Sequence, residues 1–381
     1  MSIKAAKELL QRLFRDHPTK RFAFRLWDGS EVAWGPEREF TFVFHDAKTF
    51  QTLLRSQDPA LFGVAYVENR IDIEGDLYAA IVLGRYLRSI QLNLGEKFRV
   101  ALRLGLPTKH HTREKDTRDV QAHYDLSNDF YRLFLDANLI YSCAYFASTD
   151  QSLEAAQERK LDLICRKLRL KPGETFLDVG CGWGALILWA ATHYGVHAHG
   201  ITLSQNQLEL ARARIRNAGL EDRVTVELRH YLDLPNGTTY DKIASIGMIE
   251  HVGIKSYPSY FSALYRVLAP GGLLLNHGIT VKQRDAKRTG GEFILTYVFP
   301  GAELDTLSHT LEETEAAGFE VIDVEDMRPH YALTLREWMR RFLTNEAKAA
   351  VLVPERILRI WRLYLPSCAL GFEEGIIGIY Q

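Results

Sequence analysis

Cysteine is scarce in this chain, and its few copies are spaced too widely for the usual cysteine-based scaffolds. The four cysteines, Cys143, Cys165, Cys181 and Cys368, form no Cys-x-x-Cys pair. Disulfide-stapled domains and structural zinc sites both need cysteines at short, regular spacings. The sequence therefore indicates neither a disulfide framework nor a metal site, and we expect a reducing cytoplasm as its compartment.

Long apolar runs are also missing. No stretch approaches the roughly 18 consecutive apolar residues of a membrane-spanning helix. Segment 3–14 is not a secretory signal, because charged residues interrupt its apolar positions and a signal needs an uninterrupted apolar core. The net charge of −1 argues against binding to nucleic acid. We therefore expect a soluble or peripheral protein without a nucleic-acid partner.

Positive charge is nevertheless concentrated in two places. Segment 97–118 has two acidic residues against the basic residues Lys97, Arg99, Arg103, Lys109, Arg113, Lys115 and Arg118. Arg336, Arg340 and Arg341 form a second cluster. Two interpretations stay open: solvated helix faces with a linker, or attraction to an anionic membrane surface.

The first 110 residues predict a small α+β domain. Alternating apolar residues and an Asp28-Gly29 turn indicate a small antiparallel sheet, followed by helical periodicity. The expected strands are 21–27, 32–34 and 40–44, and the expected helices are 47–55 and 76–93. Residues 111–150 then read as a linker with further helices.

From about residue 150 the pattern changes to strands that alternate with helices, which is typical of a doubly wound, mostly parallel α/β sheet. Domain 151–381 is expected to hold a seven-stranded sheet with a helical insertion at 333–370. The expected strands are 175–179, 196–201, 223–228, 241–247, 272–278, 319–324 and 376–380.

A glycine-rich motif follows the first of these strands. Phe176-Leu-Asp178-Val-Gly180-Cys181-Gly182-Trp183-Gly184 reads as strand, turn and helix, the arrangement in which a backbone approaches a nucleotide closely. Its glycines are two residues apart, unlike the Gly-x-Gly-x-x-Gly of dinucleotide sites. With the acidic residue just before the turn, this motif resembles the first motif of class I methyltransferases, which bind S-adenosylmethionine.

Three further motifs narrow the resemblance. They are Tyr141-Ser-Cys-Ala-Tyr-Phe146, Gly200-Ile-Thr-Leu-Ser-Gln-Asn-Gln207 and Gly247-Met-Ile-Glu-His-Val-Gly253. In this order, they make residues 120–381 resemble the cyclopropane-fatty-acid and mycolic-acid cyclopropane synthases. The resemblance implies a class I methyltransferase fold and transfer of a methyl group to lipid acyl chains.

The resemblance also implies a set of cofactor-binding residues. These are Tyr141, Ser142, Phe176, Asp178, Gly180, Cys181, Gly182, Trp183, Gly184, Thr202, Leu203, Gln207, Tyr231 and Leu232. Tyr141 and Ser142 would close over the methionine end of the cofactor, and the loop 176–184 would wrap its amino acid and ribose. Thr202, Leu203 and Gln207 would hold the ribose hydroxyls. Tyr231 and Leu232 would flank the adenine, Leu232 through its backbone.

The chemistry needs a base, because methylation of an alkene leaves a carbocation that must lose a proton before a ring can close. The resemblance implies a bicarbonate ion as this base, held by Cys143, Glu250, His277, Ile279 and Tyr331. The two side chains His277 and Tyr331 would donate hydrogen bonds, two backbone N–H groups (of Cys143 and Ile279) would do the same, and Glu250 would accept the proton. Cys368 matches a cysteine sometimes labelled a nucleophile, although a thiolate beside a carbocation would itself be alkylated.

The N-terminal domain bears on the substrate. Full-length bacterial cyclopropane synthases resemble this chain in having an extra domain there, so residues 1–110 favour membrane phospholipid acyl chains, docking on the inner face of the membrane and a homodimer. Two alternatives stay open. One is a sibling fatty-acid methyltransferase that gives a methyl or methylene branch, and the other is a non-catalytic lipid-binding protein.

Overall fold

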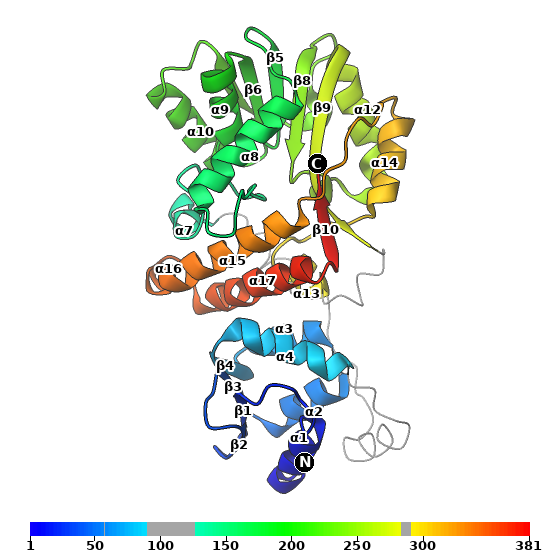
Figure 1. Cartoon of the computed structure of the whole chain (residues 1–381). Coiled ribbons are helices and arrows are strands. Elements are labelled where there is room, and N and C mark those ends of the chain that lie inside the picture. The colour runs from blue at the N-terminus through cyan, green and yellow to red at the C-terminus, as the bar shows by residue number, and fades with distance from the viewer. Residues whose placement is uncertain (57, 90–125, 283–290) are drawn as a thin grey trace. The chain divides into compact units, whose positions relative to one another are not determined.

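The computed structural model describes residues 1–56, 58–89, 126–282 and 291–381, and the chain divides into two compact units (Figure 1). The first unit comprises Met1–Gln121, Ala286–Val298 and Pro354–Ser367, and the second comprises Ala122–Asp285, Phe299–Val353 and Cys368–Gln381. The basic segment 97–118 lies outside the described residues. The first unit thus includes two segments from the second half of the chain.

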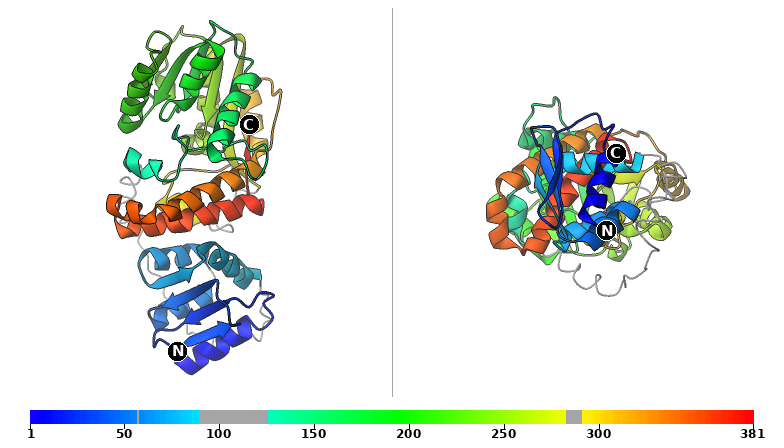
Figure 2. Two further views of the ribbon diagram at one scale, coloured as in Figure 1. Left: turned by 60° about the vertical axis from the view of Figure 1, so that its left-hand side comes forward. Right: turned by 90° about the horizontal axis from the view of Figure 1, so that it is seen from below.

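The first unit contains a four-stranded sheet in the order β2-β1-β3-β4, drawn in blue in Figure 2. Its strands are β1 (Phe22–Arg25), β2 (Glu31–Trp34), β3 (Phe40–Phe44) and β4 (Ile71–Gly75). The expected antiparallel sheet is wrong for the central pair, because β1 and β3 run parallel. The N–H of Glu39 donates to the carbonyl of Arg21 at 2.7 Å, so the chain after β2 crosses back to the start of β1 instead of forming a hairpin.

Helices complete the described part of the first unit. They are α1 (Ile3–Leu13), α2 (Ala47–Ser56), α3 (Pro59–Val67), α4 (Leu77–Ser89), α13 (Gly291–Tyr297) and the first part of α17 (Glu355–Glu373). The predictions for 47–55 and 76–93 are confirmed by α2 and by α4 as far as Ser89, whereas α3 and β4 were not predicted. The buried Arg359 of α17 donates to the carbonyls of Tyr66 and Ile71 and pairs with Asp72 at 2.7 Å. This residue fixes the start of α17 within the first unit.

The second unit contains a six-stranded sheet in the order β10-β9-β8-β5-β6-β7. Its strands are β5 (Thr175–Val179), β6 (His197–Thr202), β7 (Val224–Leu228), β8 (Tyr240–Ile246), β9 (Leu268–Val281) and β10 (Ile377–Tyr380). All neighbours are parallel except β10, which runs antiparallel to β9. The predicted doubly wound α/β class is confirmed.

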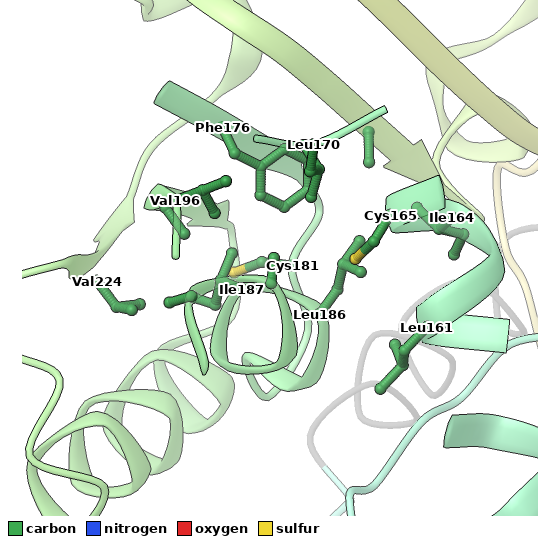
Figure 3. Close-up of a cluster of buried hydrophobic side chains, with 14 of the residues drawn as sticks. Leu161, Ile164, Cys165, Leu170, Phe176, Cys181, Leu186, Ile187, Val196 and Val224 are labelled. Atoms are coloured by element: carbon green, nitrogen blue, oxygen red, sulfur yellow. The ribbon is translucent and has the colours of Figure 1, made fainter. Parts of the chain in front are cut away.

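Alternate residues of the central strands point to two separate apolar cores. Phe176 packs with the cluster of α8 (Leu153–Lys167), α9 (Ala185–Tyr194) and α10 (Gln205–Asn217), part of which Figure 3 shows. Leu177, the next residue, packs on the opposite face with α12 (Tyr257–Val267). Burial on both faces explains why β5 reads as a continuous apolar run around Asp178.

The expected strand at 319–324 is wrong, and among the described residues the sheet has six strands where seven were predicted. Ile322 and Val324 are 66% and 40% exposed, so their alternation does not mark a buried strand face. Pairing with β10 begins only at Glu325, which exchanges backbone hydrogen bonds with Gln381 at 2.9 and 3.0 Å. A single isolated bridge, between Asp326 and Tyr380, joins this segment to the sheet.

The predicted helical insertion is confirmed, but it begins earlier than expected and consists of three helices. They are α15 (Arg328–Thr344), α16 (Glu346–Leu352) and α17 (Glu355–Glu373). Within the ranges that the structure describes, no helix has the length and apolar character that a membrane crossing demands.

Candidate active site

The glycine-rich turn after β5 is held in shape by the neighbouring strand. The N–H groups of Gly180 and Cys181 both donate to the carbonyl of Ile201 in β6, at 2.9 and 3.0 Å. Gly180, Gly182 and Gly184 have φ angles of 80°, 54° and 83°, a left-handed region that glycine alone adopts at little cost. The sequence therefore folds here into a tight turn rather than a simple helix start.

Space is open beside the middle of this turn. A Cβ added at Gly182 would meet no heavy atom within 4 Å, whereas a Cβ at Gly180 would lie 2.5 Å from the side chain of Met248. Gly180 is thus required for packing, while Gly182 leaves room for something outside the protein. This cradle fits the close approach of a nucleoside to the backbone.

The residues expected at the ribose run from Thr202, the last residue of β6, to Gln207 in the first turn of α10. The Thr202 hydroxyl donates to Oε1 of Gln207 at 2.8 Å and accepts from the N–H of Ser204 at 3.2 Å. Leu203 between them is 66% exposed, so it projects away from the core. The structure brings Thr202 and Gln207 together and leaves Leu203 on the surface.

The residues expected at the adenine form the 3-10 turn η1 (Tyr231–Asp233) after β7. Tyr231 is buried, and Leu232 is 47% exposed. The N–H of Leu232 donates to Nδ1 of His230 at 3.2 Å. If the Leu232 backbone binds the adenine, as expected, its carbonyl is the group free to do so.

The segment that contains Tyr141 and Ser142 is anchored to the glycine-rich turn. Arg214 of α10 donates to the carbonyls of Asn138 and Trp183, at 2.9 and 3.0 Å. Leu139 has a φ of 55°, which is uncommon for a residue with a side chain. The arginine thus fixes the covering segment and the cofactor turn to each other.

Glu250 forms the centre of a second group of buried polar atoms. It lies in α11 (Ile249–Val252), and glycine at position 278 lets this helix approach β9. Its Oε1 accepts from the N–H of Ile279 at 2.7 Å, and its Oε2 is buried without a hydrogen-bond partner among the described residues. Burial raises the pKa of Glu250 to about 7.

The Ile279 N–H, expected to donate to a bicarbonate ion, donates to Glu250 in this structure and so orients its carboxyl group. Its donation to bicarbonate stays a prediction. Glycine at position 278 and this amide together determine where Oε2 of Glu250 points.

His277 and Tyr331 lie in the same region. His277, on β9, is 1% exposed, its Nε2 has no partner among the described residues, and burial lowers its pKa to about 3. Burial raises the pKa of Tyr331 well above its usual value, with further contributions from Cys143, Cys368 and Glu250. These interactions place Tyr331 beside three of the expected site residues.

The two cysteines of this group are both protonated at neutral pH. Burial raises the pKa of the Cys143 thiol, which donates to the carbonyl of Ala144 at 3.2 Å. Burial also raises the pKa of Cys368 to about 12. A neutral thiol is a poor nucleophile, which argues against a nucleophilic role for Cys368.

Trp338 links the two groups of residues. It is a fully buried residue of α15, and its ring centroid lies 5.2 Å from that of Tyr141 and 6.0 Å from that of Tyr331. The sequence prediction did not include it. A wall of aromatic rings therefore runs between the cofactor-covering segment and the buried polar group.

Comparison with known proteins identifies the family. The model of the mycolic acid cyclopropane synthetase family matches residues 111–381. The chain belongs to this family. Residues 7–89 match a domain of unknown function.

Relatives of the synthetase family agree with this assignment. A probable fatty acid methyltransferase of Pseudomonas putida is 43% identical over 360 residues, 94% of this chain and 90% of the relative. Cyclopropane mycolic acid synthase 1 of Mycobacterium tuberculosis is 39% identical over 276 residues, 69% of this chain and 95% of the relative. The resemblance inferred from the motifs is confirmed, and the chain is a member of a family of S-adenosylmethionine-dependent, lipid-modifying methyltransferases.

Solved structures of the synthetase family agree as well. The crystal structure of mycolic acid cyclopropane synthase CmaA1, complexed with SAH and CTAB, has a TM-score of 0.65 and 38% identity to this chain. The match covers 69% of this chain and 96% of the mycobacterial protein.

In this synthetase family member, α8 carries two further polar residues that the sequence prediction missed. Gln157 is 0% exposed and Lys160 is 2% exposed, although both lie on the apolar face of the helix. Gln157 donates to the carbonyl of Ser142 at 2.9 Å, and Nζ of Lys160 lies 3.1 Å from the Ser142 hydroxyl. A glutamine and a lysine three residues apart in an otherwise apolar stripe are the signal that would have revealed them.

Lys160 is also close to two acidic residues. Burial lowers its pKa to about 8, while the nearby Asp136 and Asp178 oppose that shift. Burial raises the pKa of Asp178 to about 7, and Lys160 counteracts the rise. Among the residues described, no group of three His, Cys, Asp or Glu side chains is placed to hold a metal ion.

Proposed function

We propose that this protein transfers a methylene from S-adenosylmethionine to the cis double bond of phospholipid acyl chains and forms a cyclopropane ring. The observation that carries the proposal is the pair of buried, unpartnered atoms, Oε2 of Glu250 and Nε2 of His277. Leaving a buried polar group unsatisfied costs about 1–3 kcal/mol, so such atoms are expected to meet a ligand.

The cofactor residues have separate tasks in this proposal. Bound S-adenosylmethionine supplies a methyl group made electrophilic by the positive sulfur. The turn at Gly180–Gly184 and the Thr202–Gln207 pair would hold its amino acid and ribose, and Tyr231 would flank its adenine. The covering segment with Tyr141 and Ser142 would exclude water from the methyl group.

The reaction balances without a redox step. The π electrons of the alkene form a bond to the methyl carbon while the carbon–sulfur bond breaks, which leaves a cation on the chain. Aromatic faces attract cations by roughly 0.5–2 kcal/mol each, and Trp338, Tyr141 and Tyr331 offer such faces. Loss of a proton from the new methyl group then lets the electrons of that C–H bond close the ring.

Glu250 and His277 would hold the bicarbonate ion that takes this proton. His277 is neutral because burial lowers its pKa to about 3, so it can donate one hydrogen bond. Glu250, with a pKa raised to about 7, can pass between its ionised and protonated forms near neutral pH and so accept the proton. Cys143 and Tyr331 would line the same space.

The membrane supplies the substrate in this proposal. The enzyme would be cytoplasmic, peripheral to the inner face of the membrane and homodimeric, with the first unit assisting docking. The arginine cluster contributes little to attraction by anionic lipid, because Arg336, Arg340 and Arg341 pair with Glu373, Glu337 and Glu154. Attraction would therefore rest on segment 97–118.

A second candidate is supported by the Pseudomonas putida relative, whose name is that of a fatty acid methyltransferase. The same cation gives a methylene branch if a hydride shifts along the chain before the new methyl group loses its proton, and a methyl-branched alkene if the proton leaves from the chain. A saturated methyl branch also needs a reductant that supplies a hydride. A non-catalytic lipid-binding protein is disfavoured, because it would leave Oε2 of Glu250 and Nε2 of His277 buried without the anion that the proposed catalysis gives them.

Removing carbonate tests the proposed base. We expect carbonate-depleted buffer to slow the native enzyme and added bicarbonate to restore it. Glu250→Gln should bind S-adenosylmethionine normally, turn over slowly and recover only partly with bicarbonate, because it has no ionised oxygen to accept the proton. The control is Glu174→Gln, because the native Glu174 carboxylate also accepts a backbone N–H, that of Lys171 at 2.8 Å. This variant should behave as the native enzyme. A native rate indifferent to carbonate would return the base to a side chain.

A further inference from the structure

The hydrogen of the neutral His277 ring can reside on either nitrogen, and only one choice suits an anion at Nε2. His277 is 1% exposed on β9, and burial keeps its ring uncharged at neutral pH. A neutral imidazole has one donor and one acceptor nitrogen. Whatever occupies Nδ1 therefore decides whether Nε2 carries a hydrogen.

Gln381 occupies Nδ1. Its Nε2 lies 3.2 Å from Nδ1 of His277, and an amide nitrogen can only donate. With the amide in this orientation Nδ1 is the acceptor and the hydrogen resides on Nε2. Both this Nε2 and Oε1 of Gln381 have no hydrogen-bond partner in the described part of the chain.

The backbone holds Gln381 in place for this contact. In the β9–β10 register Tyr380 faces Gly278, so the next residue of the chain comes beside His277. Gln381 also exchanges two backbone hydrogen bonds with Glu325, at 2.9 and 3.0 Å. The backbone of Gln381 is therefore held beside His277, where its amide reaches Nδ1.

We propose that Gln381 is a positioning residue that fixes His277 as the Nε2–H tautomer and so presents a hydrogen-bond donor to an anion beside Glu250. The anion rests on the proposed function, whereas the tautomer does not depend on it. The opposite orientation of the Gln381 amide would place its oxygen at Nδ1 and the hydrogen there, which would leave Nε2 as an acceptor that repels an anion.

Nuclear magnetic resonance tests the tautomer directly. In protein labelled with 15N-histidine and kept free of carbonate, long-range proton–nitrogen correlations identify which ring nitrogen is protonated, and His277→Gln assigns the signal. We expect Nε2–H in the native protein. Gln381→Glu, with a carboxylate that accepts, should move a hydrogen to Nδ1. A native signal from the Nδ1–H form, or no change in Gln381→Glu, would overturn the proposal.

Kinetics separates this proposal from the proposed function. Gln381→Met keeps the side-chain length and removes the amide, so the bicarbonate concentration for half-maximal rate should rise about tenfold, as expected for one hydrogen bond to an anion. The KM for S-adenosylmethionine should stay unchanged, and the exposed Gln205→Met is the control. If the tautomer is as expected but the rate ignores bicarbonate, the proposed base fails while the role of Gln381 stands. If the native rate does depend on bicarbonate, an unchanged requirement in Gln381→Met would contradict the positioning role.

Discussion

The carboxyl group of Glu250 lies where its ionised form is disfavoured. Its pKa in the folded protein is about 7, above the ordinary value of 4.5, and burial is the main cause. A raised pKa of this kind stabilises the fold fully below pH 4.5, and this stabilisation is lost as pH rises through 7. Glu250 is therefore kept at a cost to stability above neutral pH, as is common for functional residues.

Glu250→Gln should reveal this cost. Glutamine stays neutral and its oxygen can still accept from Ile279, so the variant should unfold like the native protein at about pH 4.5 and be more stable by about 3 kcal/mol at about pH 9. Denaturant unfolding in carbonate-free buffer at both pH values measures the difference. Equal stability at the higher pH would mean that Glu250 ionises freely.

Gly182 gives a second prediction at the residue scale. A valine there would fill the open space beside the turn, so Gly182→Val should abolish S-adenosylmethionine binding. Gly219→Val is the matched control, because Gly219 also has a positive φ, of 64°, and no heavy atom within 4 Å of an added Cβ. Both variants place a valine at a positive φ, 54° at position 182 and 64° at position 219, yet only the first should lose binding in calorimetry. Native affinity in a folded Gly182→Val protein would exclude this turn as the cofactor site.

The motifs of the sequence predicted Glu250, Gly182 and the other residues that stand next to turns, because turn chemistry is local. Residues that act through the tertiary fold were missed. Gln381 comes near His277 only through the antiparallel register of β10, and nothing in the sequence around position 381 shows that pairing. Trp338 reads as an ordinary core residue of an amphipathic helix.

Helix α8 is the element that connects the core to the covering segment. Its buried polar residues, Gln157 and Lys160, both bond to Ser142. A buried lysine carries a large desolvation cost, so its presence beside Asp136 and Asp178 indicates a functional demand.

Lys160→Met tests this role of the helix. The variant keeps the apolar stem but removes the contact with Ser142 and the charge beside Asp178, so S-adenosylmethionine affinity should fall about tenfold, as for one charged hydrogen bond. Lys242→Met, at another buried lysine that pairs with Glu174 at 3.9 Å, is the control. Both should lose stability, but only Lys160→Met should weaken binding in calorimetry. Equal affinity in the two variants would make Lys160 a purely structural residue.

Among the elements, the sequence predicted those with strong apolar periodicity. The prediction failed where apolar residues alternate but are not buried. The alternation at 319–324 suggested a strand, but Ile322 and Val324 face solvent. The parallel pairing of β1 with β3 is set by where the chain crosses after β2, and the alternation of apolar residues is the same in either direction.

At the scale of the whole molecule, two ranges of the chain match different family models. Residues 111–381 match the mycolic acid cyclopropane synthetase family, while residues 7–89 match a domain of unknown function. Methyl transfer is assigned to residues 111–381, which match the synthetase family. In the proposed function, the selection of membrane phospholipid as substrate depends on both ranges.

The product formed on membrane lipids tests the central claim most directly. The full chain would be expressed in a bacterial host that makes no such lipids, and phospholipid acyl chains would be analysed by mass spectrometry and proton magnetic resonance, with Gly182→Val as the inactive control. We predict unsaturated chains that gain one carbon and two hydrogens, lose their alkene signals and show cyclopropane protons. Chains that gain the carbon but carry a methylene or methyl branch, or phospholipids that stay unmodified, would contradict the proposed cyclopropane synthase.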